Sequence, residues 1–159
     1  MTVGQVRTKR VVTANPDETI PEVAQRMREL HVGDVVITDR QNRPVGILTD
    51  RDIVVSAVAQ SHDKLGTLAV GDVMSRNLLT ARATDLVAAA LRKMHEHGIR
   101  RLPVVGTDGR LEGILTLDDV LEMLSSEFTE LVGLVALEQK RERQTRPSPE
   151  VAAAVASKG

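Results

Sequence analysis

The chain repeats itself with a period of 67 residues. Residues 3–53 align with residues 70–120 without an insertion or a deletion, and 13 of the 51 aligned positions are identical. The clearest match is Gly-Ile-Leu-Thr-x-x-Asp, which begins at Gly46 and again at Gly113. A match of this length indicates an internal duplication. We expect each half to need the other, because a unit of this size buries only about 60% of the surface that its unfolded chain exposes.

Each half has the pattern of a strand, a helix, two strands and a second helix. In the first half, β-branched residues at 10–13 predict a strand. Apolar residues recur with helical spacing over 20–30, and apolar runs at 35–37 and 45–49 predict the next two strands. A second helix follows, capped by the threonine that ends the last strand or by the aspartate after it. We expect one side of that helix to be apolar, with Ile53, Val54, Ala57 and Val58.

The second half predicts the same elements at equivalent positions. Residues 78–80 are the expected first strand, and the following helix ends at 97–98. Strands at 101–105 and 112–116 come next, and a last helix begins at 117. We expect that helix to turn four apolar side chains inward: Leu117, Val120, Leu121 and Leu124.

The predicted domain organisation follows from this alignment and from changes in composition. Polar residues and Gly66 separate the two halves, and an apolar helical stripe after the second half fades into charged residues. The apolar half of that helix should pack on the body or on a partner subunit. The expected parts are repeat one at 1–59, a linker at 60–69, repeat two at 70–125, a C-terminal helix at 126–143 and a disordered tail at 144–159.

Composition argues against several classes of function. A net charge of −1 gives no field for nucleic acid or a membrane surface, and one Phe without Trp or Tyr disfavours stacking on bases. No apolar run is long enough to span a membrane and no signal peptide is evident, so we expect a cytoplasmic protein. The absence of cysteine excludes thiol chemistry. No catalytic motif is present, and we expect neither an enzyme nor a metal site.

The paired Gly-Ile-Leu-Thr-x-x-Asp motifs, the stretch at 98–105 and the Val-Gly-x-Val openings at Val3 and Val70 resemble a tandem pair of cystathionine-β-synthase (CBS) domains. This module is often found regulating enzymes, channels and transporters, and the resemblance covers about residues 3–125. It implies an α/β (α+β) fold in which two β-α-β-β-α repeats pack about a pseudo-twofold axis. It also implies that two such pairs assemble into a homodimer.

A threonine at a strand end, with an aspartate three residues later, places a hydroxyl and a carboxylate where ligands gather in open α/β folds. An ionised carboxylate accepts hydrogen bonds from the vicinal hydroxyls of a ribose, and the hydroxyl with the helix N-terminus suits a phosphate. The resemblance assigns these roles to Thr49 and Asp52 in repeat one and to Thr116 and Asp119 in repeat two. Helix capping explains the same residues and does not exclude binding.

A phosphate also needs cations, and here the two repeats differ. Arg100 and Arg101 precede a buried strand, and a guanidinium group fits a phosphate well. The equivalent positions in repeat one are Gly33 and Asp34, and Asp34 would repel a phosphate. Arg51 is the candidate replacement there, with a solvated surface arginine as the alternative. We therefore predict a better site in repeat two, with both arginines beside its Thr and Asp.

Adenine would lie in an aliphatic slot because no aromatic ring is available to stack on it. Leu79, Ile99 and Ile114 are the candidate lining residues, and they would be core residues in any case. The predicted nucleotide-binding residues are Thr49, Arg51, Asp52, Ile99, Arg100, Arg101, Thr116 and Asp119. The candidate ligands are AMP, ADP, ATP and S-adenosylmethionine.

The leading hypothesis is a non-enzymatic sensor that binds an adenosine nucleotide between the repeats and signals to a protein partner in trans. The alternative is a ligand-free CBS homodimer that acts as a protein–protein interaction module. The absence of phosphate-binding cations from repeat one favours this alternative.

Overall fold

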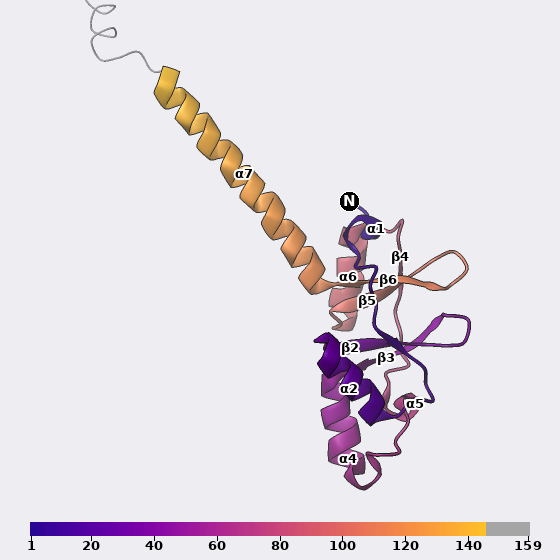
Figure 1. The fold of residues 1–159 in the computed structure, drawn as a ribbon. Helices are drawn as coiled ribbons and strands as arrows, with labels where there is room; N and C mark the ends of the chain where they lie inside the picture. The colour runs from indigo at the N-terminus through magenta and orange to yellow at the C-terminus, as the bar shows by residue number, and fades with distance from the viewer. Residues whose placement is uncertain (146–159) are drawn as a thin grey trace, which may run out of the picture. The chain divides into compact units, whose positions relative to one another are not determined.

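The computed structural model describes residues 1–145, apart from the side chains at 61 and 62 (Figure 1). The predicted disordered tail at 144–159 therefore lies almost wholly outside the described residues. The chain divides into two units, Met1–Val120 and Leu121–Gly159. The first unit contains repeat one and repeat two as far as Val120, which lies in the first turn of the last helix.

Two three-stranded sheets of the same topology form the first unit (Figure 1). In each, the first strand is parallel to the second and the second is antiparallel to the third. The strands are β1 (Thr13–Ala14), β2 (Asp34–Thr38) and β3 (Pro44–Thr49) in one sheet, and β4 (Ala81–Arg82), β5 (Arg101–Val105) and β6 (Leu111–Thr116) in the other. The pairing is equivalent too, since Asp34 pairs with Thr49 and Arg101 with Thr116. The α/β fold class that the resemblance implies is thus confirmed.

The first strand of each repeat is shorter and later in the chain than predicted. Residues 78–80 are not part of a strand, and pairing starts at Ala81; in repeat one it starts at Thr13. Strand propensity reports how a side chain fits a pleated surface and not whether a partner strand lies beside it. Leu78 and Leu79 instead line a cleft between the repeats.

The first helix of each repeat packs on its sheet through one apolar face, as predicted. These helices are α2 (Ile20–Leu30) and α6 (Val87–His97). Their buried residues are Ile20, Val23 and Met27 in α2, and Val87, Ala90 and Met94 in α6. Each helix ends at a left-handed residue, His31 with φ 53° and the equivalent Gly98 with φ 63°. The two residues have similar backbone angles although only one of them is glycine.

The second helix of repeat one differs from the expectation. It consists of α3 (Asp50–Asp52), a π-helical segment (Ile53–Val58) and α4 (Ala59–Ser61), and a 3₁₀ turn (His62–Lys64) follows, so helical structure continues into the predicted linker. Ala57 is buried, but Val54 and Val58 are exposed, so the apolar side expected of this helix is only partly buried in the single chain. A π-helical turn holds more residues than an α-helical one, and the apolar side chains therefore leave the face that α-helical spacing predicts.

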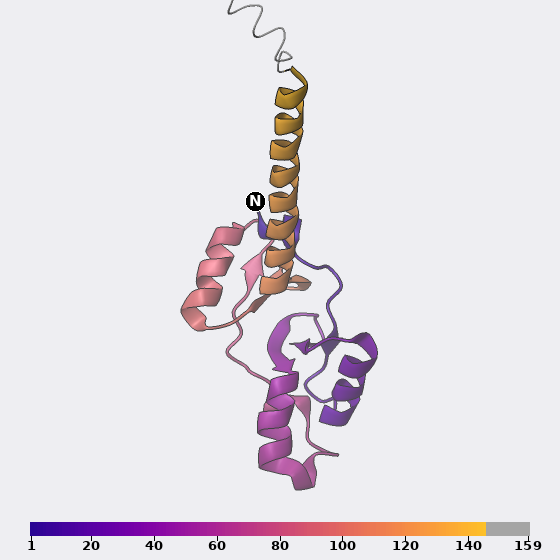
Figure 2. The same cartoon turned by 90° about the vertical axis from the view of Figure 1, so that its left-hand side faces the viewer.

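The last helix, α7 (Leu117–Thr145), is one continuous element (Figure 2). It includes both the second helix of repeat two and the segment predicted as a C-terminal helix. Val120 is buried, whereas Leu121 and Leu124 are exposed in the single chain, in contrast to the prediction. The apolar residues further along are also exposed: Phe128, Leu131, Val132, Leu134, Val135 and Leu137. Among the described residues, no helix is long and apolar enough to cross a membrane.

Each repeat receives a short backbone segment from the other. The helix α1 (Val3–Val6) bonds to repeat two, with the N–H of Val3 donating to Asp85 O at 2.8 Å (Figure 1). The helix α5 (Val70–Val73) bonds to repeat one in the equivalent way, from Val70 to Glu18 O at 2.8 Å. Val70 and Met74 are consequently part of the hydrophobic core around α2 and β2.

Two reciprocal backbone bridges follow these helices and pass over the repeated motif. Thr8 pairs with Ile114, with both N–H···O distances at 2.9 Å, and Ser75 pairs with Ile47. The glycine before each isoleucine leaves room for this crossing. A Cβ atom on Gly113 would lie 2.8 Å from the carbonyl oxygen of Thr8, and one on Gly46 would lie 3.0 Å from that of Ser75. The motif glycines are therefore needed for close approach of two backbones.

We predict that Gly113→Ala destabilises the protein by about 1–3 kcal/mol, because the crossing backbone has to move. The free energy of unfolding from urea titration is the measurement. Gly133→Ala is the matched control, since a Cβ there meets nothing within 4 Å and alanine favours a helix by up to about 1 kcal/mol. A Gly113→Ala variant as stable as the wild type would contradict the close approach.

Candidate functional site

Two clefts lie between the repeats, and the period of 67 residues relates them. The first is formed by the end of β3 and the start of α3, together with residues 75–79 and 98–101 of the other half of the chain. The second is formed by the end of β6 and the start of α7, together with residues 8–12 and 32–34. The first has a volume of about 330 Å³ and the second about 170 Å³. Each motif is therefore completed by residues of the opposite repeat.

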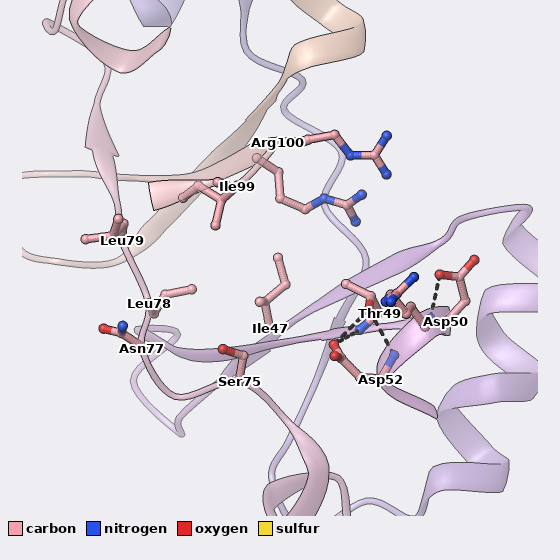
Figure 3. A pocket seen from close by; sticks show the side chains of 13 residues that line it. Ile47, Thr49, Asp50, Asp52, Ser75, Asn77, Leu78, Leu79, Ile99 and Arg100 are labelled. Carbon is pink, nitrogen blue, oxygen red and sulfur yellow. Dashed lines mark hydrogen bonds between the residues drawn. The ribbon is translucent and has the colours of Figure 1, made fainter. Parts of the chain in front are cut away.

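Thr49 and Asp52 form one wall of the first cleft (Figure 3). The Oγ1 of Thr49 accepts from the N–H of Asp52 at 3.1 Å and donates to Asp52 Oδ2 at 2.8 Å. The N–H of Thr49 also donates to Asp52 Oδ2, at 2.9 Å. The two residues thus cap the helix, as the capping interpretation predicts. Within the described residues no hydrogen bond uses Asp52 Oδ1, so this oxygen can still accept one.

The facing wall of the first cleft carries the arginine pair. Arg100 is exposed and Arg101 is partly buried, and both line this cleft together with Ile99. This grouping differs from the predicted one, which placed both arginines with the motif of their own repeat. The difference arises because the repeats pack against each other, so that the wall of one faces the motif of the other. Arg51 lines the same cleft with an exposed side chain.

Apolar side chains line the part of the first cleft that is away from Asp52. Ile47, Leu78, Leu79 and Ile99 line it, and Figure 3 shows them together on the side opposite Asp50 and Asp52. Leu79 and Ile99 were predicted for this slot, whereas Ile114 lines the second cleft. Ile47, which is equivalent to Ile114 in the repeat, lines the first cleft instead. The sequence contained this signal, because Ile47 and Ile114 occupy the same position of the repeated motif.

The second cleft holds Thr116 and Asp119 with a different set of neighbours. The Oγ1 of Thr116 donates to Asp119 Oδ2 at 2.6 Å, and the Oγ1 of Thr8 donates to Asp119 Oδ1 at 3.0 Å. Both carboxylate oxygens are therefore engaged, unlike those of Asp52. Arg10 lines this cleft together with Asp34. Sequence reasoning missed Thr8 and Arg10, because they lie in the other repeat and outside the motif.

Asp34 and Arg101 form an ion pair at equivalent positions of the two repeats. Their side chains are 21% and 23% exposed, so water screens the pair only in part. Burial raises the pKa of Asp34, the Arg101 guanidinium lowers it, and the carboxylates of Asp50 and Asp119 raise it further. The net direction is upward, so burial and like charges outweigh the attraction to Arg101.

Comparison with known proteins identifies relatives of both repeats. A family model of the CBS domain matches residues 3–58 and 70–126. Protein MK0525 of Methanopyrus kandleri is 39% identical over 123 residues, which are 77% of this chain and 62% of that relative. The chain thus spans less than two thirds of the length of this relative.

Two solved structures are similar to the fold. The CBS domain pair of protein MJ0100, in complex with 5′-methylthioadenosine and S-adenosyl-L-methionine, matches with a TM-score of 0.71 and 28% identity, over 80% of this chain and 98% of that chain. The structure of CBSX2 in complex with AMP matches with a TM-score of 0.68 and 30% identity, over 79% and 96%. Adenosine compounds are therefore bound by two proteins of this fold.

The raised pKa of Asp34 predicts how stability depends on pH. A carboxyl group with a raised pKa in the folded state contributes stability below its unfolded pKa, and this contribution is lost as the pH rises through the folded pKa. The free energy of unfolding of the wild type should therefore fall relative to that of Asp34→Asn as the pH rises from below about 4, the unfolded pKa of an aspartate, through the raised folded pKa. Urea titrations of both proteins across this range test the expectation, and a difference that stays constant with pH would contradict it.

Proposed function

The chain belongs to the CBS domain family, and on this premise we propose that it is a regulatory sensor that binds an adenosine nucleotide in the first cleft. AMP, ADP and ATP are the candidate ligands. One observation carries the proposal: the open carboxylate oxygen of Asp52 shares a cleft with Arg100 and Arg101. An acceptor for sugar hydroxyls and cations for a phosphate are thereby combined in one place.

The lining of the first cleft fits the three parts of such a ligand. Asp52 Oδ1 suits the vicinal hydroxyls of the ribose, and the apolar side chains around Ile47 and Ile99 suit the adenine ring. The phosphate would lie toward the arginines. A sulfonium group would be repelled by the same guanidinium groups, so this cleft favours AMP, ADP or ATP over S-adenosylmethionine. That CBSX2 is found with AMP supports the choice.

We propose that signalling involves a homodimer and a protein partner in trans, in the cytoplasm. Apolar side chains are exposed on the helices that follow the motifs: Val54, Val55 and Val58 after the first, and Leu121 and Leu124 after the second. Burial of such side chains against a second copy would remove apolar area from water, at about 25 cal/mol per Å². Ligand binding would act on a partner through its differential affinity for two conformations.

The alternative is a ligand-free interaction module, and the exposed apolar face of α7 favours it. Its other support was the lack of cations in repeat one. Arg100 and Arg101 supply the first cleft with cations from repeat two, so this second argument no longer applies. The two proposals now differ in a single measurable property, which is nucleotide binding.

Isothermal titration calorimetry of nucleotide-free protein with AMP, ADP, ATP and S-adenosylmethionine tests the sensor. We expect Asp52→Asn to weaken nucleotide binding by about tenfold or more, because a charged acceptor is lost while the amide can still cap the helix. Asp119→Asn is the matched control and should have little effect. The opposite pattern would place the ligand in the second cleft, and no heat with any of the four ligands would favour the interaction module.

Sedimentation velocity tests the dimer. We expect the wild type to sediment as a dimer, and Val54→Glu with Val58→Glu to shift it toward the monomer, because charges would enter a buried apolar contact. Leu30→Glu is the control, since Leu30 is equally exposed at the end of α2 and lies outside this face. A monomeric wild type would refute assembly through these helices.

A further inference from the structure

The ion pair between Asp34 and Arg101 joins the two clefts. Position 34 becomes position 101 when the repeat period of 67 is added, so the pair connects equivalent residues of the two repeats. Arg101 lines the first cleft, and Asp34 lines the second. One of the cations that the first cleft offers to a phosphate is therefore already in contact with a carboxylate of the second cleft.

Arg101 can exchange its contact with Asp34 for a contact with another anion. Its Nη1 atom is buried and meets Asp34 as an ion pair, but makes no well-directed hydrogen bond. The carboxylates of Asp50 and Asp119 crowd Asp34, and burial opposes its charge, which together raise its pKa. Burial and the neighbouring carboxylates therefore oppose the charge on which the pair depends. A guanidinium group with unused donors will turn to a better acceptor when one arrives.

A ligand phosphate in the first cleft would be such an acceptor. It offers several charged oxygens, whereas Asp34 offers a crowded carboxylate. We propose that Asp34 competes with the ligand phosphate for Arg101, and that this competition limits the protein to one phosphate-bearing ligand per chain. The inference rests on the proposed nucleotide site in the first cleft.

Release of Arg101 changes the second cleft as well. Asp34 would then be unpaired beside Asp119, with Arg10 as the cation that lines the same cleft. Two carboxylates against one guanidinium disfavour a second phosphate there. The first cleft would be filled at the expense of phosphate binding in the second. Linkage makes the coupling reciprocal, because each ligand changes the affinity of the other by the same factor.

A double-mutant cycle tests the competition. The four proteins are the wild type, Asp34→Asn, Arg101→Gln and the double variant, each titrated with AMP and with adenosine by calorimetry. We expect Asp34→Asn to tighten AMP binding by about fivefold or more. Adenosine is the matched ligand without a phosphate, and its affinity should not change. In the Arg101→Gln background, Asp34→Asn should have no effect on AMP, because the residue for which the two anions compete is absent.

The remaining outcomes separate the possible failures. Weaker AMP binding in Asp34→Asn would show that Asp34 orients Arg101, and would overturn the competition. If Asp34→Asn tightens AMP binding equally with and without Arg101, the effect is a general one of the Asp34 charge, and this result would also overturn the competition. Two molecules of AMP per wild-type chain would refute the limit of one. If neither adenosine nor any of AMP, ADP and ATP binds the wild type, the proposed function itself fails.

Folding of the variants is controlled within the same cycle. The double variant replaces an ion pair by two neutral amide groups that can bond to each other, so it should remain folded. Thermal unfolding of all four proteins checks this. If Asp34→Asn alone is unstable, Asp34→Ser supplies a second neutral side chain at that position, and the same tightening of AMP binding is expected.

Discussion

The reciprocal exchange of backbone segments holds the two repeats together. Residues 3–8 bond to repeat two and residues 70–75 bond to repeat one, so the core of each repeat is completed by the other. The bridge from Thr8 to Ile114 and the one from Ser75 to Ile47 lie directly on the repeated motif. Because the glycine before each isoleucine admits the crossing backbone, one short motif specifies both the strand and the way in which the repeats associate.

This exchange also determines where the clefts lie. The crossing segments bring residues 8–12 and 75–79 beside the strand end of the opposite repeat. Each cleft is consequently composite, with a motif from one repeat and a wall from the other. Neither repeat alone could form either cleft. A ligand in one cleft would touch both repeats, and this is the geometry that a sensor of their relative arrangement requires.

Local patterns predicted most of the fold, and the failures share a physical cause. Helices α2 and α6 follow from apolar spacing and the duplication from the alignment. The π-helical segment at Ile53–Val58 was missed because its wider turn depends on packing rather than on spacing. Leu121 and Leu124 satisfy the pattern of a buried face but are exposed, because a pattern records apolar character and not which surface covers it. Arg100 and Arg101 line the first cleft and not the cleft of Thr116 and Asp119 for a similar reason, since distance along the chain says little about the partner across an interface.

The identity of the two motifs is less informative about binding than the differences around them. Thr49 with Asp52 and Thr116 with Asp119 form the same capping hydrogen bonds, so helix capping accounts for these residues whether or not a ligand binds. The positions that distinguish the clefts lie outside the motifs. Gly33 and Asp34 stand where the other repeat has Arg100 and Arg101. Thr8 donates to Asp119 Oδ1, whereas the equivalent oxygen of Asp52 has no such partner among the described residues. Two clefts built from one duplicated unit have thereby become unequal in charge and in free acceptors. This inequality, and not the shared motif, supports the proposal that a phosphate-bearing ligand lies in the first cleft.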